Sequence, residues 1–304
     1  MNAIEQYFLN VKNVKPKTME NYINMLTRLN EGEKPTTADF LKDHKRIFDF
    51  LDDKYSLTTQ RTYLICIVSL LQSREDMEKE KDIYYNRLQE LNFQYNSGID
   101  EYKKSAREEE NMCELEELKL IANFWVESLD DVLYDNSLHG KVFQTYKMAL
   151  VALLYTELPP IRLDWANFII VHNQSEIEDN KNYVLIEESG KMSFILQKYK
   201  TSKTHKTKTF HPTEKLKNVI NDWLTLNDSG YLFPNQKQNG PMSENAFGKM
   251  IPKAFESTGK KITLNILRHV WISANVDHAV LDYNDNLAAQ MCHTTGTQRT
   301  YIKV

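Results

Sequence analysis

The stretch ITLNILRHVWISANVDHAVLDYNDNLAAQMCHTTGTQRTYIKV, residues 262–304, carries three chemically distinctive features in order. An Arg268–His269 pair lies inside an apolar helical pattern, His293 follows it, and Tyr301 comes eight residues after His293. Arginine offers planar, permanently charged donors to phosphate oxygens, and a tyrosine hydroxyl can form a covalent ester. Together these residues predict chemistry on a phosphodiester.

Two features upstream supply further cations. Arg162 follows the apolar helical run 148–155 and the pair Pro159-Pro160. A basic segment at 198–208, KYKTSKTHKTK, has the pattern of a pair of strands. Both features are expected to contribute to the same site.

In this order the residues resemble the tyrosine recombinase, or integrase, family, whose catalytic domain carries Arg, a hairpin Lys, His-x-x-Arg, His or Trp, and then Tyr. The resemblance covers roughly residues 140–304 well and the N-terminal helical part loosely. It implies six catalytic positions: Arg162, Lys203, Asn265, Arg268, His293 and Tyr301. Asn265 departs from the family pattern, because the family usually has His three residues before the second Arg.

The resemblance implies a site-specific DNA recombinase or integrase that cleaves and rejoins strands through a 3′-phosphotyrosyl intermediate. Tyr301 would be the nucleophile, and Lys203 would give a proton to the leaving 5′ oxygen. Asn265 can hydrogen-bond a phosphate oxygen, but it cannot carry a proton. Preorganised cations stabilise such a transition state without a metal, so we expect no cofactor.

Two other functions fit the same residues. A type IB topoisomerase shares this catalytic set but relaxes DNA as a monomer. A DNA-binding relative whose catalysis has decayed would account for Asn265. The composition, rich in Asn and Lys and poor in Gly, is similar to that of recombinases of large DNA viruses and eukaryotic mobile elements.

The resemblance also implies the partners, which are double-stranded DNA and further copies of the chain in a tetramer on DNA. Only three residues follow Tyr301, too few to hold an assembly together, so we expect a monomer in free solution. The N-terminus lacks the pattern of a secretory signal, and no apolar run is long enough to cross a bilayer. We expect an intracellular protein, located wherever its target DNA resides, with no membrane partner.

The net charge of −4 at first counts against DNA binding, but the charge is unevenly distributed. Residues 191–217 hold eight lysines against one acid, Glu214. Local field matters more than the total for binding a polyanion. We therefore predict phosphate contacts from four of these lysines: Lys198, Lys200, Lys206 and Lys208.

The chain is long enough for two domains, and helical periodicity dominates it. We predict a mainly α protein with a small antiparallel sheet, in the α+β class: a helical DNA-clamping domain at 1–95, a charged linker at 96–111 and a catalytic domain at 112–304. Apolar β-rich runs predict strands at 168–171, 183–186, 193–196 and 206–211. His269 is predicted to be a buried packing residue. Three widely spaced cysteines indicate reduced thiols rather than a disulfide framework or a zinc site.

Overall fold

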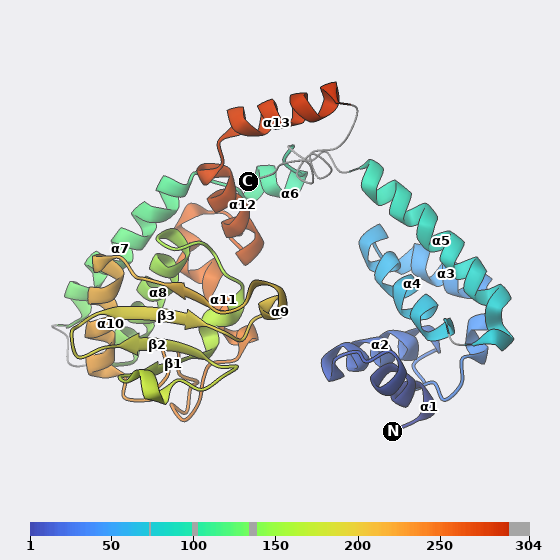
Figure 1. Cartoon of the computed structure of the whole chain (residues 1–304), viewed down its shortest axis with the longest axis horizontal. Helices are drawn as coiled ribbons and strands as arrows, with labels where there is room; N and C mark the ends of the chain where they lie inside the picture. Colours follow the sequence, from blue (N-terminus) through green and yellow to red (C-terminus); the bar gives the residue numbers. More distant parts are fainter. Residues whose placement is uncertain (73, 99–102, 134–138, 292–304) are drawn as a thin grey trace. The chain divides into compact units, whose positions relative to one another are not determined.

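The computed structural model describes residues 1–72, 74–98, 103–133 and 139–291 (Figure 1). The chain divides into two compact units, Met1–Lys103 and Lys104–Val304. The division falls inside the segment 96–111 for which we predicted a linker, and the later part of that segment forms a helix, α6 (Ala106–Asn111).

The first unit is entirely helical in its described part. Its elements are α1 (Ala3–Gln6), a π-helical turn (Tyr7–Val11), α2 (Pro16–Leu29), a 3-10 turn (Asp39–Lys42), α3 (His44–Lys54), α4 (Leu57–Leu71), a 3-10 turn (Glu75–Met77) and α5 (Glu78–Ser97). Their apolar faces bury one core that includes Phe8, Leu26 and Ile67. The hydroxyl of buried Tyr84 donates to the carbonyl of Leu41 at 2.8 Å, which ties α5 to the first 3-10 turn.

The second unit surrounds a four-stranded sheet with helices. After α6 come α7 (Leu115–Leu133), α8 (His139–Thr156), a 3-10 turn η4 (Leu163–Asn167), β1 (Phe168–Val171), a 3-10 turn (Gln174–Glu176), β2 (Asn182–Ile186), β3 (Met192–Leu196), α9 (Ser202–His205), β4 (Lys208–Phe210), α10 (Glu214–Leu226), α11 (Glu244–Ala254), a 3-10 turn (Glu256–Thr258), α12 (Leu264–Asn275) and α13 (His278–Gln290). This composition confirms the predicted mainly α fold with a small sheet.

The sheet is mixed, so the prediction of a purely antiparallel sheet is wrong. The strand order is β1-β2-β3-β4, with β1 parallel to β2 and the other two pairs antiparallel. Residues 172–181 between β1 and β2 contain a 3-10 turn, and this segment brings the chain back so that β2 runs parallel to β1. By contrast, residues 187–191 connect β2 to β3 in a short turn with Gly190 at φ +76°.

Helix α8 is the centre of the second unit. Its residues from Met148 to Tyr155 are all buried, as expected for a helix that is apolar on every side. Helices α7, α10 and α11 pack against α8, and one face of the sheet joins the same core through Phe168, Val184 and Phe194. Successive strand residues face opposite sides, and a smaller cluster of Val171, Tyr183 and Leu185 forms on the other face.

The burial of α8 gives a stability prediction. Leu153 has no exposed surface, whereas Leu120 on α7 is 68% exposed. Leu153→Ala should therefore lower the free energy of unfolding of this unit by about 2–5 kcal/mol, because the cavity it leaves cannot collapse fully. Leu120→Ala, the same truncation at an exposed site, should change it by less than about 0.5 kcal/mol.

Tryptophan fluorescence during urea unfolding measures this difference. All four tryptophans of the chain, Trp125, Trp165, Trp223 and Trp271, lie in the second unit. The signal therefore reports the unfolding of that unit alone. Equal losses for both variants would contradict the central place of α8.

Candidate active site

Arg162 lies between α8 and η4, just after a pair of prolines. Its side chain is exposed, while its backbone carbonyl makes a hydrogen bond to a buried residue. The hydroxyl of Tyr155, in the last turn of α8, donates to the carbonyl of Arg162 at 2.8 Å. Because Tyr155 is fully buried in the core, this bond holds the start of η4 against α8.

Arg268 lies on α12, which begins after Thr263; the Thr263 hydroxyl accepts from the backbone N–H of Ile266. Residues Ile266, Leu267 and Val270 are buried against the core. The opposite face of the helix, with Asn265 exposed and Arg268 half-buried, is thereby left accessible.

Both arginines have a relation to Tyr155, one through a hydrogen bond and one through its effect on the tyrosine pKa. Burial raises the pKa of the Tyr155 phenol, and the Asp164 carboxylate raises it further. The Arg268 guanidinium is close enough to act on that pKa in the opposite direction. Arg162 by its backbone and Arg268 by its charge therefore both lie next to one buried tyrosine.

An acidic residue, Asp164, lies near Arg162. The pKa of Asp164 is raised, chiefly by burial and then by the nearby Glu244, while the Arg162 guanidinium lowers it. Arg162 is thus close enough to Asp164 to interact with it. Sequence reasoning missed Tyr155, Asp164 and Glu244 as members of this region. The only local signal was the position of Asp164 two residues after Arg162.

The basic segment differs from its prediction. Residues 198–207 form a loop with the single-turn helix α9, and only Lys208 of the predicted basic strand pair lies in a strand. The Tyr199 hydroxyl donates to the carbonyl of Lys206 at 2.5 Å, and Lys206 has φ +58°. This closure makes the segment a compact loop, with Lys203 exposed on its helical turn.

The lysines of this region fall into two groups. Lys191, Lys215 and Lys217 are 3.8, 3.3 and 3.6 Å from the carboxylates of Glu187, Glu157 and Glu214. Within the described residues, the lysines between them form no ion pair and are all exposed: Lys198, Lys200, Lys203, Lys206 and Lys208. Five cations with no carboxylate partner form a surface suited to a polyanion.

His293 and Tyr301 lie outside the described residues, so their predicted roles stay predictions. His269 is described, and its predicted burial is wrong. Its side chain is 53% exposed, with Nε2 3.1 Å from Glu108 Oε1. The core stripe of α12 runs through 266, 267 and 270, which leaves position 269 to meet α6 instead.

Helix α6 is joined to this part of α12 at several points. Ser105 and Glu108 form a capping box, and Ser105 lowers the pKa of Glu108, with a smaller contribution from His269. The backbone N–H of Lys261 donates to the Asn111 side chain at 2.8 Å. Lys260 Nζ donates to the carbonyl of Met112 at 2.5 Å. The residues 105–112, hereafter the α6 strap, therefore hold the segment that leads into α12.

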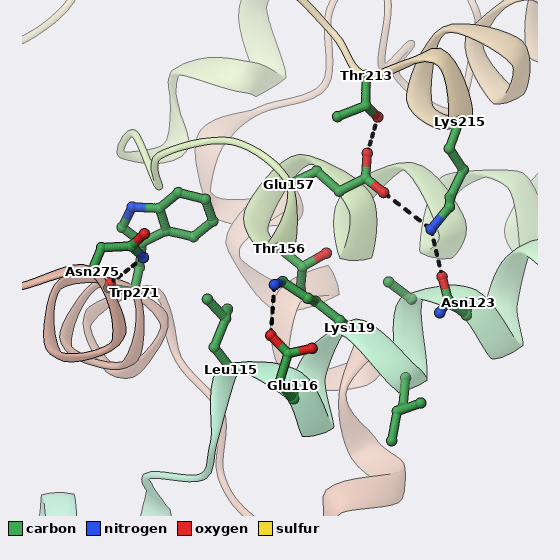
Figure 2. A pocket seen from close by; sticks show the side chains of 12 residues that line it. Leu115, Glu116, Lys119, Asn123, Thr156, Glu157, Thr213, Lys215, Trp271 and Asn275 are labelled. Carbon is green, nitrogen blue, oxygen red and sulfur yellow. Dashed lines mark hydrogen bonds and ion pairs between the residues drawn. The ribbon is translucent and has the colours of Figure 1, made fainter.

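A groove of about 400 Å³ lies at the C-terminal end of α12. It is lined by Trp271 and Asn275 together with residues of α7. Figure 2 shows Glu157 between Thr213, whose hydroxyl donates to it, and Lys215. Lys215 also donates to Asn123 at 2.8 Å. The described lining of the groove contains none of the predicted catalytic residues. Its two lysines, Lys119 and Lys215, pair with Glu116 and Glu157. These contacts join α7, α8 and α10 and indicate a structural connection.

Across the described ranges, no group of three or more His, Cys, Asp or Glu side chains is arranged to hold a metal ion. In the same residues, no helix combines the length and apolarity needed to span a bilayer.

No family model matches the sequence, and no curated protein matches it. Among solved structures, the chain is similar to the crystal structure of XerA recombinase. The identity is 14% and the TM-score 0.33, over 90% of this chain and 84% of that one.

The bond between Tyr155 and Arg162 predicts a measurable effect. Tyr155→Phe removes only the donor to the Arg162 carbonyl, and should lower the free energy of unfolding of the second unit by about 0.5–1.5 kcal/mol. Tyr146→Phe is the matched control, because Tyr146 is a buried residue of the same helix whose hydroxyl makes no hydrogen bond within the described residues. The measurement is again urea unfolding by tryptophan fluorescence. Equal effects would mean that the bond does not stabilise the start of η4.

Proposed function

We propose that this chain is a site-specific DNA recombinase that cuts and rejoins strands through a covalent link between Tyr301 and a 3′ phosphate. The observation that carries the proposal is the placement of Arg162 and Arg268 beside the same buried Tyr155. Guanidinium groups are suited to hold a phosphate through its non-bridging oxygens.

In the proposed reaction the Tyr301 hydroxyl gives its proton to a water molecule and its oxygen attacks phosphorus, while the bond from phosphorus to the 5′ oxygen breaks. Lys203 protonates that leaving oxygen. Arg162 and Arg268 donate to the non-bridging oxygens, with His293 as a further donor, and stabilise the charge that builds up there. Asn265, exposed on the same helix as Arg268, can donate an amide N–H to the phosphate. Rejoining reverses these steps with a 5′ hydroxyl as the nucleophile.

The exposed lysines that have no carboxylate partner among the described residues support the choice of DNA as substrate. Lys198, Lys200 and Lys206 lie with Lys203 in the loop 198–207, and Lys208 follows at the start of β4. Phosphate contacts from such residues act on every DNA sequence and release counterions. They would bring Lys203 close to the DNA backbone. On DNA we propose that copies of the chain assemble as a tetramer.

A nicked duplex tests the proposal. When cleavage next to the nick releases a short fragment, rejoining is blocked and a covalent adduct accumulates. We expect a covalent protein–DNA adduct that survives denaturation. Peptide mass spectrometry should locate the attached nucleotide on Tyr301. Binding to duplex DNA without any adduct would favour the alternative of a DNA-binding relative with decayed catalysis.

A second assay separates the recombinase from a type IB topoisomerase. Supercoiled plasmids with one or two copies of a candidate target site are incubated with the chain. A recombinase exchanges strands between two sites, whereas a topoisomerase relaxes both plasmids alike and yields no recombinant product.

A further inference from the structure

A second cavity, of about 540 Å³, lies between α8 and the turn that precedes α11. Helix α8 contributes Phe143, Gln144 and Lys147, which recur at helical spacing and so share one face. The turn contributes Asn235, Gln236 and Gln238. This turn is closed by an isolated antiparallel β-bridge between Pro234 and Pro241. A hydrogen bond from the Asn235 N–H to the carbonyl of Gly240, at 2.8 Å, closes it further.

Lys147 is the only charged side chain among the described residues that line this cavity. It is half-buried on α8, and no carboxylate pairs with it within the described part of the chain. Burial lowers the pKa of its amine. A half-buried ammonium group without a partner is unfavourable, so an anion bound beside it would stabilise its charged form.

The rest of the lining offers neutral donors. The side chains of Gln144, Gln236 and Gln238 make no hydrogen bond to other described residues, so their amides are available to a ligand. Asn235 donates to Asn239 at 3.0 Å, which holds the turn in shape. Phe143 supplies an apolar surface beside these amides.

Both walls come from segments that lack acidic residues. Helix α8 has none from His139 to Thr156, and the turn has none between Asp228 and Glu244. Each wall carries one more exposed lysine, Lys141 on the helix and Lys237 in the turn, and neither forms an ion pair within the described residues. Among the described residues that line this cavity, an anion would meet one cation and several amides but no carboxylate.

We propose that this cavity binds a phosphate group, with Lys147 as the charged donor and the amides of Gln144 and Gln236 as neutral donors. Phosphate suits the site because its several acceptor oxygens can use an ammonium and more than one amide at once. The phosphate can come from a DNA backbone or from a free ion or nucleotide. The site is distinct from the candidate active site, because Lys147 lies eight residues before Tyr155, about 12 Å along the helix axis.

NMR of the full chain labelled with ¹³C-lysine provides the test. The Lys147 Cε signal, assigned by its loss in Lys147→Gln, is followed while inorganic phosphate, adenosine monophosphate or a short DNA duplex is added at constant ionic strength. We expect a saturable shift of this signal. Lys147→Gln should weaken phosphate binding, measured by calorimetry, about tenfold or more.

Two variants make the result specific. Gln236→Ala changes the turn without altering α8 and should also weaken binding. Lys181→Gln should leave binding unchanged, because Lys181 is exposed and already pairs with Glu178 at 2.6 Å. A response to phosphate or nucleotide shows a site for the free anion, and a response to DNA alone shows that the backbone is its source.

The inference is overturned if the Lys147 signal shifts with none of the three probes, or if it shifts equally with chloride. It is also overturned if Lys147→Gln binds phosphate as well as the unchanged chain does. None of these measurements uses strand cleavage. Failure of the proposed recombinase activity would therefore leave this test intact, and failure here would leave the cleavage assays intact.

Discussion

Tyr301→Phe is expected to abolish every covalent protein–DNA adduct while leaving the affinity for duplex DNA within about twofold. The substitution removes only the hydroxyl that would attack phosphorus, and phenylalanine has no nucleophilic oxygen to replace it. The measurement is adduct formation on a nicked duplex, resolved under denaturing conditions, alongside a binding titration. An adduct that persists at the level of the unchanged chain would refute the assignment of Tyr301.

Tyr283→Phe is the matched control for this experiment. Tyr283 lies on α13 and is 66% exposed, so loss of its hydroxyl should affect neither folding nor adduct yield. If the Tyr283 variant lost the adduct and the Tyr301 variant kept it, the nucleophile would lie on α13 instead.

Lys203→Ala is expected to slow cleavage by about 10²–10⁴-fold, because the leaving 5′ oxygen would depart without a proton. A substrate with sulfur at the 5′ bridging position should restore the rate, since a thiolate leaves without protonation. Lys200→Ala serves as control, because Lys200 is an exposed lysine of the same loop. Like Lys203, it forms no ion pair with any described residue. Rescue of the Lys200 variant but not of the Lys203 variant would move the role of general acid to Lys200.

Local pattern was enough to predict most elements. The run at 168–171 becomes β1 with the predicted bounds, and the apolar run 148–155 lies within α8. Both predictions rest on periodicity or composition within a few residues of sequence. The parallel pairing of β1 with β2 could not be predicted in this way, because strand direction depends on the path of the chain between the strands.

The exposure of His269 shows the same limit. Its neighbours in sequence are apolar, and they favoured burial. Its actual partner, Glu108, is distant in sequence and reaches it only through the packing of α6 on α12. Contacts between distant segments decide the surroundings of one side chain in ways that a local pattern cannot show.

The catalytic roles assigned from the sequence stay predictions. Arg162 and Arg268 were chosen from their sequence context; in the structure the Arg162 carbonyl accepts from Tyr155, and the Arg268 guanidinium acts on the pKa of the same tyrosine. The role of Tyr155 could not be predicted, because in the sequence it is one apolar-run residue among several. That the lysines between 198 and 208 have no carboxylate partner among the described residues depends on where acidic residues of other segments lie, which only the folded chain shows.

The α6 strap determines where the chain can be cut without damage to the second unit. A fragment of residues 104–304 keeps Ser105, Glu108 and Asn111, and should show the tryptophan emission and urea midpoint of the second unit in the full chain. A fragment of residues 113–304 lacks the acceptor for Lys261 and the partner of His269, and should be less stable by about 1–2 kcal/mol. Equal midpoints would show that the strap is dispensable for folding. Limited proteolysis that spares the second unit is accordingly expected to cleave before Ser105, and any gene fusion that transplants this unit to another protein must carry the strap with it.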